Sequence, residues 1–121
     1  KMVLIQAFDK SDFLGCSLHF KGTGTLYGRY WGALKNIPFL HFELCYYQAI
    51  EYAIKEKLNK VEAGAQGEHK IARGYLPELT YSNHCFNCPE LIDPISDYLK
   101  DEGKKIIETV NFLKSYSPFK S

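Results

Sequence analysis

Residues 25–64 read TLYGRYWGALKNIPFLHFELCYYQAIEYAIKEKLNKVEAG. Residues 25–33 are an aromatic-rich run of strand length. Residues 39–58 repeat apolar side chains at spacings of three and four, which is typical of one buried helical face. Residues 60–64 fit a second, short strand. A strand, a long helix and another strand predict a right-handed crossover between two parallel strands. The expected helical face consists of Leu40, Leu44, Tyr47, Ile50, Ile54 and Leu58.

The flanking sequence extends this unit into a mixed sheet. Residues 2–8 and 13–21 have the length and alternation of strands, and short polar turns join them to each other and to the strand at 25–33. Three such strands predict an antiparallel meander. The expected fold is α+β, a mixed sheet with an N-terminal antiparallel meander, a βαβ crossover and a long C-terminal helix.

Beyond residue 64 the pattern predicts three more elements. Residues 68–73 fit a short helix that Gly74 closes as a C-terminal cap. Residues 77–86 have the composition of another strand. The long helix is expected to begin with Asp93 as N-cap and Pro94 in its first turn. Its expected apolar face contains Ile95, Tyr98 or Leu99, Ile106, Val110 and Leu113.

Size and charge exclude several classes of protein. The chain has 121 residues, a length typical of one domain. Fifteen Lys and Arg against fourteen Asp and Glu give a net charge of +1, which argues against a free-standing nucleic-acid binder, so no DNA partner is expected. No apolar run reaches the ~18 residues of a membrane span. No signal peptide follows Lys1-Met2, and a cytoplasmic location is therefore expected.

Four segments closely resemble the FemAB-like family, GNAT-related proteins of peptidoglycan biosynthesis or recognition. They are GRYWG at 28–32, FLHFELCYYQ at 39–48, EAGAQGEHK at 62–70 and RGYLP at 73–77. The resemblance extends over about residues 24–86. It implies that residues 1–121 are a single GNAT-like domain, the C-terminal half of a longer two-domain architecture. The chain would then be either an excised domain or the product of a shortened gene.

The resemblance also implies a reaction. Proteins of this kind resemble bacterial cell-wall enzymes that transfer an acyl or aminoacyl group to an amine acceptor, so the expected partner is a cell-wall precursor or another amine acceptor. Acyl-CoA and aminoacyl-tRNA are the two candidate donors. The alternative is a non-catalytic domain for precursor recognition or oligomerisation. An N-terminal GNAT-like partner domain or a second copy of the chain would complete the assembly. Whether the chain is an enzyme stays open.

The segment GAQGEHK at 64–70 is the first candidate site, because it follows the C-terminal end of a parallel strand, where open α/β sheets bind ligands. Glu68 or His69 could accept a proton from an attacking amine. Lys70 and Arg73 could hold a phosphate or carboxylate. Gln66 is a further substrate-binding candidate. The alternative interpretation is a short solvated helix.

Arg29 and His41 are the other substrate-binding candidates. The pattern Arg29-x-x-Gly32-x-Leu34 resembles the turn that binds pyrophosphate in acyl-CoA-using GNAT proteins, but it ends in Leu instead of Gly or Ala. We favour the alternative that Arg29 and Gly32 belong to the sheet and not to a CoA-binding turn, and no cofactor is assigned. His41 lies at the start of the predicted helix, where it could line a cleft.

Two departures from common patterns limit the chemistry. In many GNAT proteins a Tyr ahead of a Gly-Phe or Gly-Tyr pair acts as the general acid that protonates the leaving thiolate. In this sequence the corresponding position ahead of Gly74-Tyr75 is Lys70. This favours a tRNA-ester donor or no catalysis, although a tRNA donor needs basic surface that a net charge of +1 does not supply. His84-Cys85-x-x-Cys88 is half of a zinc site without a second half, so no metal is expected.

Overall fold

The structure is a computed structural model that describes residues 1–64 and 67–119. The chain divides into two compact units, Lys1–Gly67 and Glu68–Ser121. The first holds the sheet and its covering helices, and the second holds the long C-terminal helix. That residues 1–121 form a single GNAT-like domain of a longer architecture stays a prediction.

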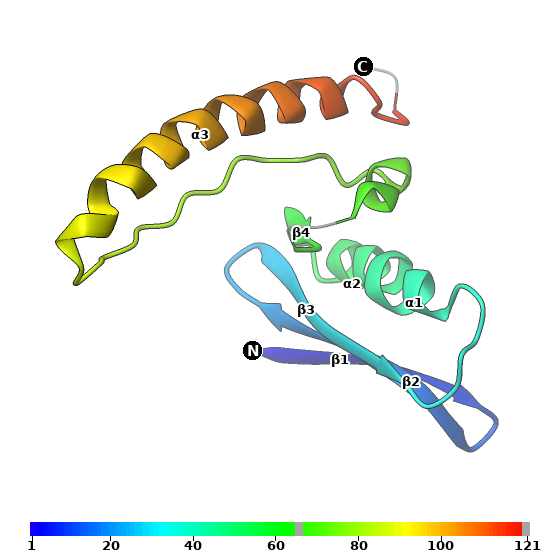
Figure 1. The fold of residues 1–121 in the computed structure, drawn as a ribbon. Coiled ribbons are helices and arrows are strands. Elements are labelled where there is room, and N and C mark those ends of the chain that lie inside the picture. The colour runs from blue at the N-terminus through cyan, green and yellow to red at the C-terminus, as the bar shows by residue number, and fades with distance from the viewer. Residues whose placement is uncertain (65–66, 120–121) are drawn as a thin grey trace. The chain divides into compact units, whose positions relative to one another are not determined.

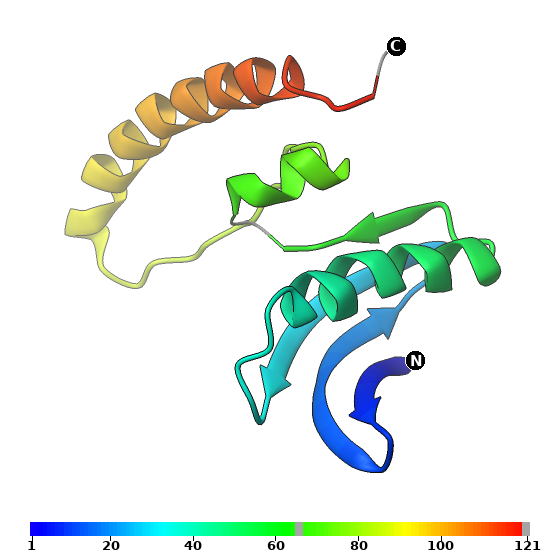
Figure 2. The same ribbon diagram turned by 90° about the vertical axis from the view of Figure 1, so that its right-hand side faces the viewer.

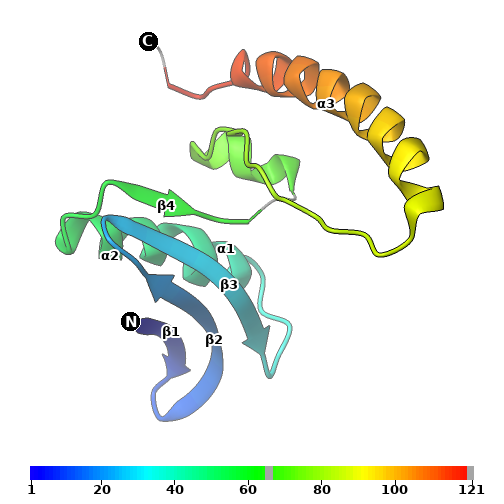
Figure 3. The same cartoon turned by 90° about the vertical axis from the view of Figure 1, so that its left-hand side faces the viewer.

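The N-terminal unit is built on a four-stranded mixed sheet of order β1-β2-β3-β4 (Figure 1). β1 pairs antiparallel with β2, β2 pairs antiparallel with β3, and β3 pairs parallel with β4, which lies beside it in Figure 3. The meander, the parallel crossover and the long C-terminal helix confirm the predicted fold class. The strands are Met2–Asp9 (β1), Asp12–Lys21 (β2), Thr25–Ala33 (β3) and Lys60–Glu62 (β4).

The crossover helix contains a π turn between two α-helical parts. α1 spans Leu40–Phe42, η1 spans Glu43–Tyr47 and α2 spans Gln48–Lys55. The Gln48 N–H donates to the Glu43 carbonyl, five residues earlier, which is the hydrogen bond of a π helix. The three parts follow one another along one face of the sheet (Figure 2).

The π turn changes which helical residues are buried. Leu44, Tyr46, Ala49 and Ala53 are buried, whereas Ile54 is 72% exposed. The prediction that Tyr47 and Ile54 belong to the buried face is therefore wrong. Regular α-helical spacing places a buried residue three or four positions after Leu44, but the π turn moves it to the fifth, Ala49.

Small and polar side chains bring the helix close to the sheet. Ala49 and Ala53 pack at the centre together with Leu26, which is fully buried on β3. The buried Ser17 hydroxyl donates to the Leu44 carbonyl over 2.7 Å and so ties β2 to η1. At the far end an exposed ion pair joins Lys21 to Glu56. The other face of the sheet carries the exposed apolar side chains of Met2, Leu4, Phe8, Phe20, Tyr27 and Tyr30.

The C-terminal unit begins with a short 3₁₀ helix, η2 (Glu68–Arg73). Gly74 has a φ of 86°, and the N–H groups of Gly74 and Tyr75 donate to the carbonyls of Ile71 and Lys70. This is a Schellman arrangement, and it confirms the prediction that Gly74 closes the helix.

Residues 77–86 form no strand, and that prediction is wrong. A strand needs a neighbour to take its backbone hydrogen bonds, and within the described residues β4 pairs only with β3. A 3₁₀ turn, η3 (Pro89–Leu91), follows and leads directly into α3 (Ile92–Lys114).

The long helix starts earlier than predicted. Its N-cap is Leu91, without a side-chain capping bond, so Asp93 is not the N-cap. Pro94 is accommodated in the first turn, where a missing N–H costs nothing because that group has no partner within the helix. The helix continues through Gly103. Ile95, Val110 and Leu113 are its half-buried apolar residues, and Leu99 and Ile106 are more exposed.

Candidate functional site

A pocket of about 190 Å³ lies in the N-terminal unit, at the C-terminal end of β4 and beside the middle of β3. The pairing of β3 with β4 ends at Tyr27 and Glu62, and the pocket occupies the space beyond this point. Open α/β sheets commonly bind ligands at such a position. We call it the β3–β4 pocket. Its lining consists of His19, Gly28, Arg29, Tyr30, Trp31, His41, Cys45, Tyr46, Ala63 and Gly64.

A bulge in β3 shapes the pocket. Leu18 on β2 pairs with Tyr30 while the next residue, His19, pairs with Gly28, so Arg29 is an extra residue on β3. Bulges bend a strand and redirect its side chains, and they are common beside active sites. Past the bulge, Trp31 pairs with the inward-facing Ser17 and so lies on the helix side of the sheet.

His19 is the most buried titratable group of the pocket, with 2% of its surface exposed. Its Nε2 lies 2.8 Å from the Ser17 Oγ, and that hydroxyl donates its own proton to the Leu44 carbonyl. A hydroxyl has one proton, so the Ser17 oxygen accepts from Nε2. The neutral imidazole therefore carries its proton on Nε2 and a lone pair on Nδ1.

The Nδ1 atom of His19 has no hydrogen-bond partner in the described part of the chain, although it is buried. An unpaired buried polar atom costs about 1–3 kcal/mol, so such an atom in a native structure needs a reason. Burial lowers the pKa of His19, and a backbone hydrogen bond to Leu44 partly offsets that effect. The imidazole is thus held as a neutral hydrogen-bond acceptor.

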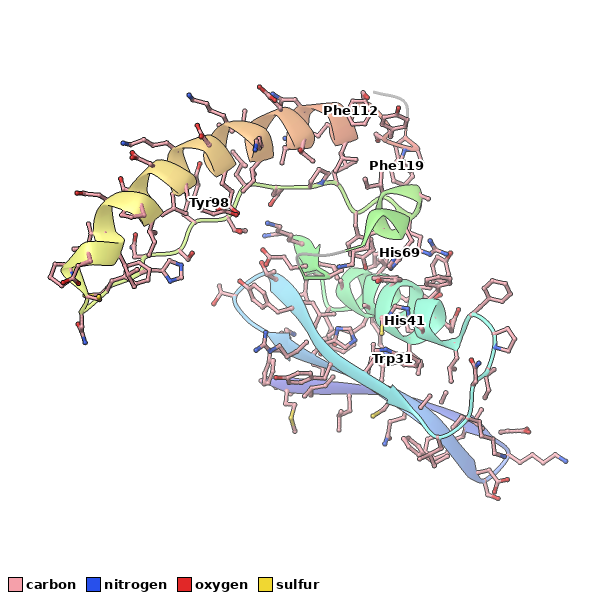
Figure 4. The ribbon with its side chains drawn as sticks, viewed as in Figure 1. Trp31, His41, His69, Tyr98, Phe112 and Phe119 are labelled. Atoms are coloured by element: carbon pink, nitrogen blue, oxygen red, sulfur yellow. The ribbon has the colours of Figure 1, made fainter. Side chains whose placement is uncertain are left out.

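Aromatic rings form one wall of the pocket. The ring of His41 on α1 lies 4.8 Å from the Trp31 ring and 5.4 Å from the Tyr46 ring, measured between centroids. Figure 4 shows Trp31 and His41 reaching toward one another from β3 and α1. The ring planes meet at 50° and 79°, so the rings pack edge against face and hold one another in position.

Cys45 and Tyr46 reach the pocket from the π turn. Single π turns within α helices are frequent at functional sites, because they displace side chains from the regular helical face. Burial raises the pKa of Cys45 to about 11, so its thiol is protonated at neutral pH and is a poor nucleophile. Cys45 is therefore part of the wall and not a covalent catalyst.

Both substrate-binding candidates from the first part of the chain line this pocket. Arg29 is exposed, with its guanidinium 5.2 Å from the centroid of the Tyr30 ring. His41 lies in the aromatic wall. Their roles toward a substrate stay predictions.

The other candidates belong to the second unit or lie outside the described residues. His69, Lys70 and Arg73 are on η2, and Glu68 begins that helix. The Arg73 Nη1 donates to the His69 carbonyl over 2.7 Å, and burial lowers the pKa of Lys70. Gln66 lies outside the described residues. The predicted catalytic and binding roles of this group stay predictions.

The sequence pattern did not single out His19, Cys45 or Tyr46. A signal for His19 exists: Ser17 and His19 occupy alternate positions of β2, so both point to the same face as the buried Gly15. Polar residues at consecutive inward positions of a strand indicate a buried polar network. Cys45 and Tyr46 depend on the π turn, which has no comparable signal.

Neither a metal nor a membrane span emerges from the described residues. They contain no group of three or more His, Cys, Asp or Glu side chains arranged to hold a metal ion. They also include no helix with the length and apolar character needed to cross a bilayer. Cys85 and Cys88 are exposed, and the Cys88 thiol donates to Glu90.

Comparison with known proteins extends the resemblance to the whole chain. The model of the FemAB-like family, described as peptidoglycan biosynthesis/recognition, matches residues 1–121. No curated protein and no solved structure matches this sequence.

Proposed function

The chain belongs to the FemAB-like family, and from that membership we propose that its N-terminal unit serves acyl or aminoacyl transfer in peptidoglycan or cell-envelope biosynthesis. The β3–β4 pocket binds the amine end of the acceptor. The acceptor is a cell-wall precursor or another molecule with a primary amine. The donor is an activated acyl ester or thioester.

One observation supports this proposal most directly: a buried, neutral imidazole nitrogen without a partner in the described residues lies in the lining of the β3–β4 pocket. An amine that attacks a carbonyl must lose a proton, and a neutral imidazole is a suitable acceptor. The aromatic wall would hold the carbon chain that carries the amine.

The experiment uses the single tryptophan of the chain. Trp31 lines the pocket and is the only tryptophan in the sequence, so its fluorescence reports on this site alone. A synthetic stem peptide with a free side-chain amine is titrated into the protein. We expect a saturable change in Trp31 fluorescence. No change with this peptide, or an equal change with a scrambled peptide, would contradict the proposal.

The size of the pocket favours a second candidate function, recognition without chemistry. Its volume of about 190 Å³ is below the ~300–1,000 Å³ of most ligand sites, and it suits one end of one molecule more than two reactants together. A transfer assay separates the two functions. The protein is incubated with the stem peptide and either aminoacyl-tRNA or acyl-CoA. The mass of the peptide is then measured by mass spectrometry. Saturable binding without a mass increase from either donor favours recognition.

A further inference from the structure

The space in front of His19 is bounded by two hydrogen-bond acceptors. A methyl group added to Gly28 would lie 3.7 Å from the His19 Nδ1 and 3.3 Å from the Glu62 carbonyl oxygen. A carbonyl oxygen has two lone pairs, so it can accept a bond from a ligand in addition to a backbone bond. A methyl group there would crowd the Glu62 carbonyl, so a ligand must approach His19 from the pocket side. The buried Nδ1 offers it an acceptor, and the complementary ligand group is a hydrogen-bond donor.

The hydrogen bonds of Ser17 prevent His19 from presenting a proton instead. Transfer of the ring proton from Nε2 to Nδ1 would leave the Ser17 oxygen opposite a nitrogen lone pair, 2.8 Å away. The Leu44 carbonyl already takes the hydroxyl proton. The network thus holds the acceptor nitrogen toward Gly28, and this is the arrangement of an oriented general base.

We infer that His19 is the general base that takes the proton of the attacking amine, an assignment that rests on the proposed function of the β3–β4 pocket. The amine nitrogen forms a bond to the carbonyl carbon of the activated ester or thioester, and its proton moves to the His19 Nδ1. The C–O or C–S bond then breaks. The leaving oxygen or sulfur takes the proton from the imidazolium, and His19 returns to its neutral form.

The assignment gives the pH dependence of binding a definite sign. Protonation of Nδ1 removes the acceptor, so affinity for an amine falls as the pH drops through the pKa of His19. The other titratable groups that face the site are Arg29 from β3, His41 from α1, and Cys45 and Tyr46 from η1. Tyr30 is also in the lining, but it pairs with Leu18 and its ring lies on the other face of the sheet. From β4 and the residues after it, Ala63 and Gly64 bring no titratable side chain.

The test compares two synthetic stem peptides on the full chain, one with a free side-chain amine and one with that amine acetylated. Binding is read from Trp31 fluorescence between pH 5 and pH 8. We expect acetylation to weaken binding about tenfold or more. The added acetyl group keeps the remaining N–H from reaching Nδ1, and a buried acceptor without its donor costs that much or more. The amine peptide should bind more weakly at pH 5 than at pH 8.

Three variants assign the effect to His19. His19→Asn keeps an oxygen acceptor near the position of Nδ1 but cannot take a proton, so it should bind the amine peptide and lose the pH dependence. His84→Asn is the matched control in the second unit and should behave like the wild type. A His41→Phe variant keeps an aromatic ring in the wall and should keep the pH dependence.

The outcomes separate the base from the pocket. Equal affinity for both peptides, or a pH dependence that persists in His19→Asn, overturns the assignment of His19 and leaves the proposed function standing. No Trp31 response to the amine peptide overturns the proposed function itself. If His19→Asn does not fold, nitrogen NMR of the wild-type imidazole decides. The amine peptide must then shift the Nδ1 signal more than the acetylated peptide does, and an equal shift overturns the assignment.

Discussion

Two Ser-x-His pairs occur in this chain, and burial is the difference between them. In one pair the Ser17 Oγ lies 2.8 Å from the His19 Nε2, and in the other the Ser82 Oγ lies 2.9 Å from the His84 Nε2. The first pair is buried between sheet and helix, whereas the second is exposed. The same chemical contact therefore has different consequences at the two places, and the second pair serves as an internal control for the first.

Replacing Ser17 should destabilise the protein much more than replacing Ser82. Ser17→Ala leaves the His19 Nε2–H and the Leu44 carbonyl without their partner in a buried place, at an expected cost of about 1–3 kcal/mol. Ser82→Ala exposes its partner to water and should change stability by less than about 0.5 kcal/mol. Urea unfolding followed by circular dichroism measures both. Equal losses in the two variants would contradict the buried network.

The lowered pKa of His19 predicts how stability changes with pH. In the unfolded chain an imidazole titrates near 6.5, and burial lowers the pKa in the folded state. The unfolded state then binds more protons between the two values, so the free energy of unfolding falls as the pH drops from about 7 and levels off below the folded pKa. Urea unfolding at pH 7.5 and pH 5.5 measures the loss.

The matched variants isolate the contribution of His19 to that loss. Removing the imidazole in His19→Asn should make the loss between the two pH values smaller than in the wild type. His84→Asn, at an exposed position, should show the wild-type loss. The same loss in the wild type and in His19→Asn would mean that other groups account for the pH dependence.

At the scale of elements, β3 and β4 stay close together just beyond the end of their pairing because a glycine stands there. Gly28 stands at this point, where a side chain would press on the Glu62 carbonyl at 3.3 Å. Gly32, farther along the same strand, has no described atom within 4 Å of the place of a methyl group. The two glycines thus differ in the space around them and not in the element that carries them.

Gly28→Ala should therefore perturb both stability and binding, and Gly32→Ala should perturb neither. Crowding at Gly28 is expected to cost about 1 kcal/mol and to block the point where a ligand would meet His19. Gly32→Ala should stay within about 0.5 kcal/mol of the wild type. Thermal unfolding and Trp31 fluorescence with the amine peptide measure the two effects. Unchanged binding by Gly28→Ala would place the ligand elsewhere.

The elements differ in how far the sequence predicts them. The strand at residues 25–33 follows from its length and its aromatic composition, and the structure has β3 at Thr25–Ala33. The π turn could not be predicted, because each residue of ELCYY fits an ordinary α helix equally well. The strand predicted at 77–86 does not form for a different reason. Composition gives the preference of a segment for extended backbone, but a strand also needs a neighbouring strand to pair with.

The candidate site was predictable only in part for the same reason. His41 and Arg29 stand at recognisable positions, one at a helix start and one in a glycine-rich strand, and both line the pocket. His19 sits in the middle of a strand, and only its pairing with Gly28 brings it to the pocket. His19 and Gly28 are far apart in the sequence, and their pairing depends on the register of β2 against β3, which neither segment shows by itself.

At the scale of the whole molecule, the two units differ in how completely they bury their apolar residues. The N-terminal unit has a core around Leu26 and Ala49. In the C-terminal unit no described residue of α3 is buried. Residues 75–88 connect η2 to η3 without helix or strand, and Tyr81 among them is 90% exposed.

Limited proteolysis should therefore cut the connecting segment first. Exposed backbone without secondary structure is the preferred site of proteolytic cleavage. Chymotrypsin cleaves after aromatic residues, and we expect its first cut after Tyr81 or Phe86, identified by mass spectrometry of the fragments at early times. Tyr27 and Tyr30 in β3 supply the comparison, since both are exposed but held in the sheet. A first cut after either of these would contradict the expectation.

The π turn makes the crossover helix sensitive to its length as well as to its composition. One residue corresponds to about 100° of rotation about a helix axis. Removing a single residue from ELCYY at 43–47 would restore a regular helix and turn everything on one side of the cut by that angle. Either Ala49 and Ala53 would leave the core, or His41 would leave the aromatic wall. The extra residue of the π turn thus sets the rotation between the two ends of the helix. It lets Ala49 and Ala53 at one end face the core while His41 at the other end lines the pocket.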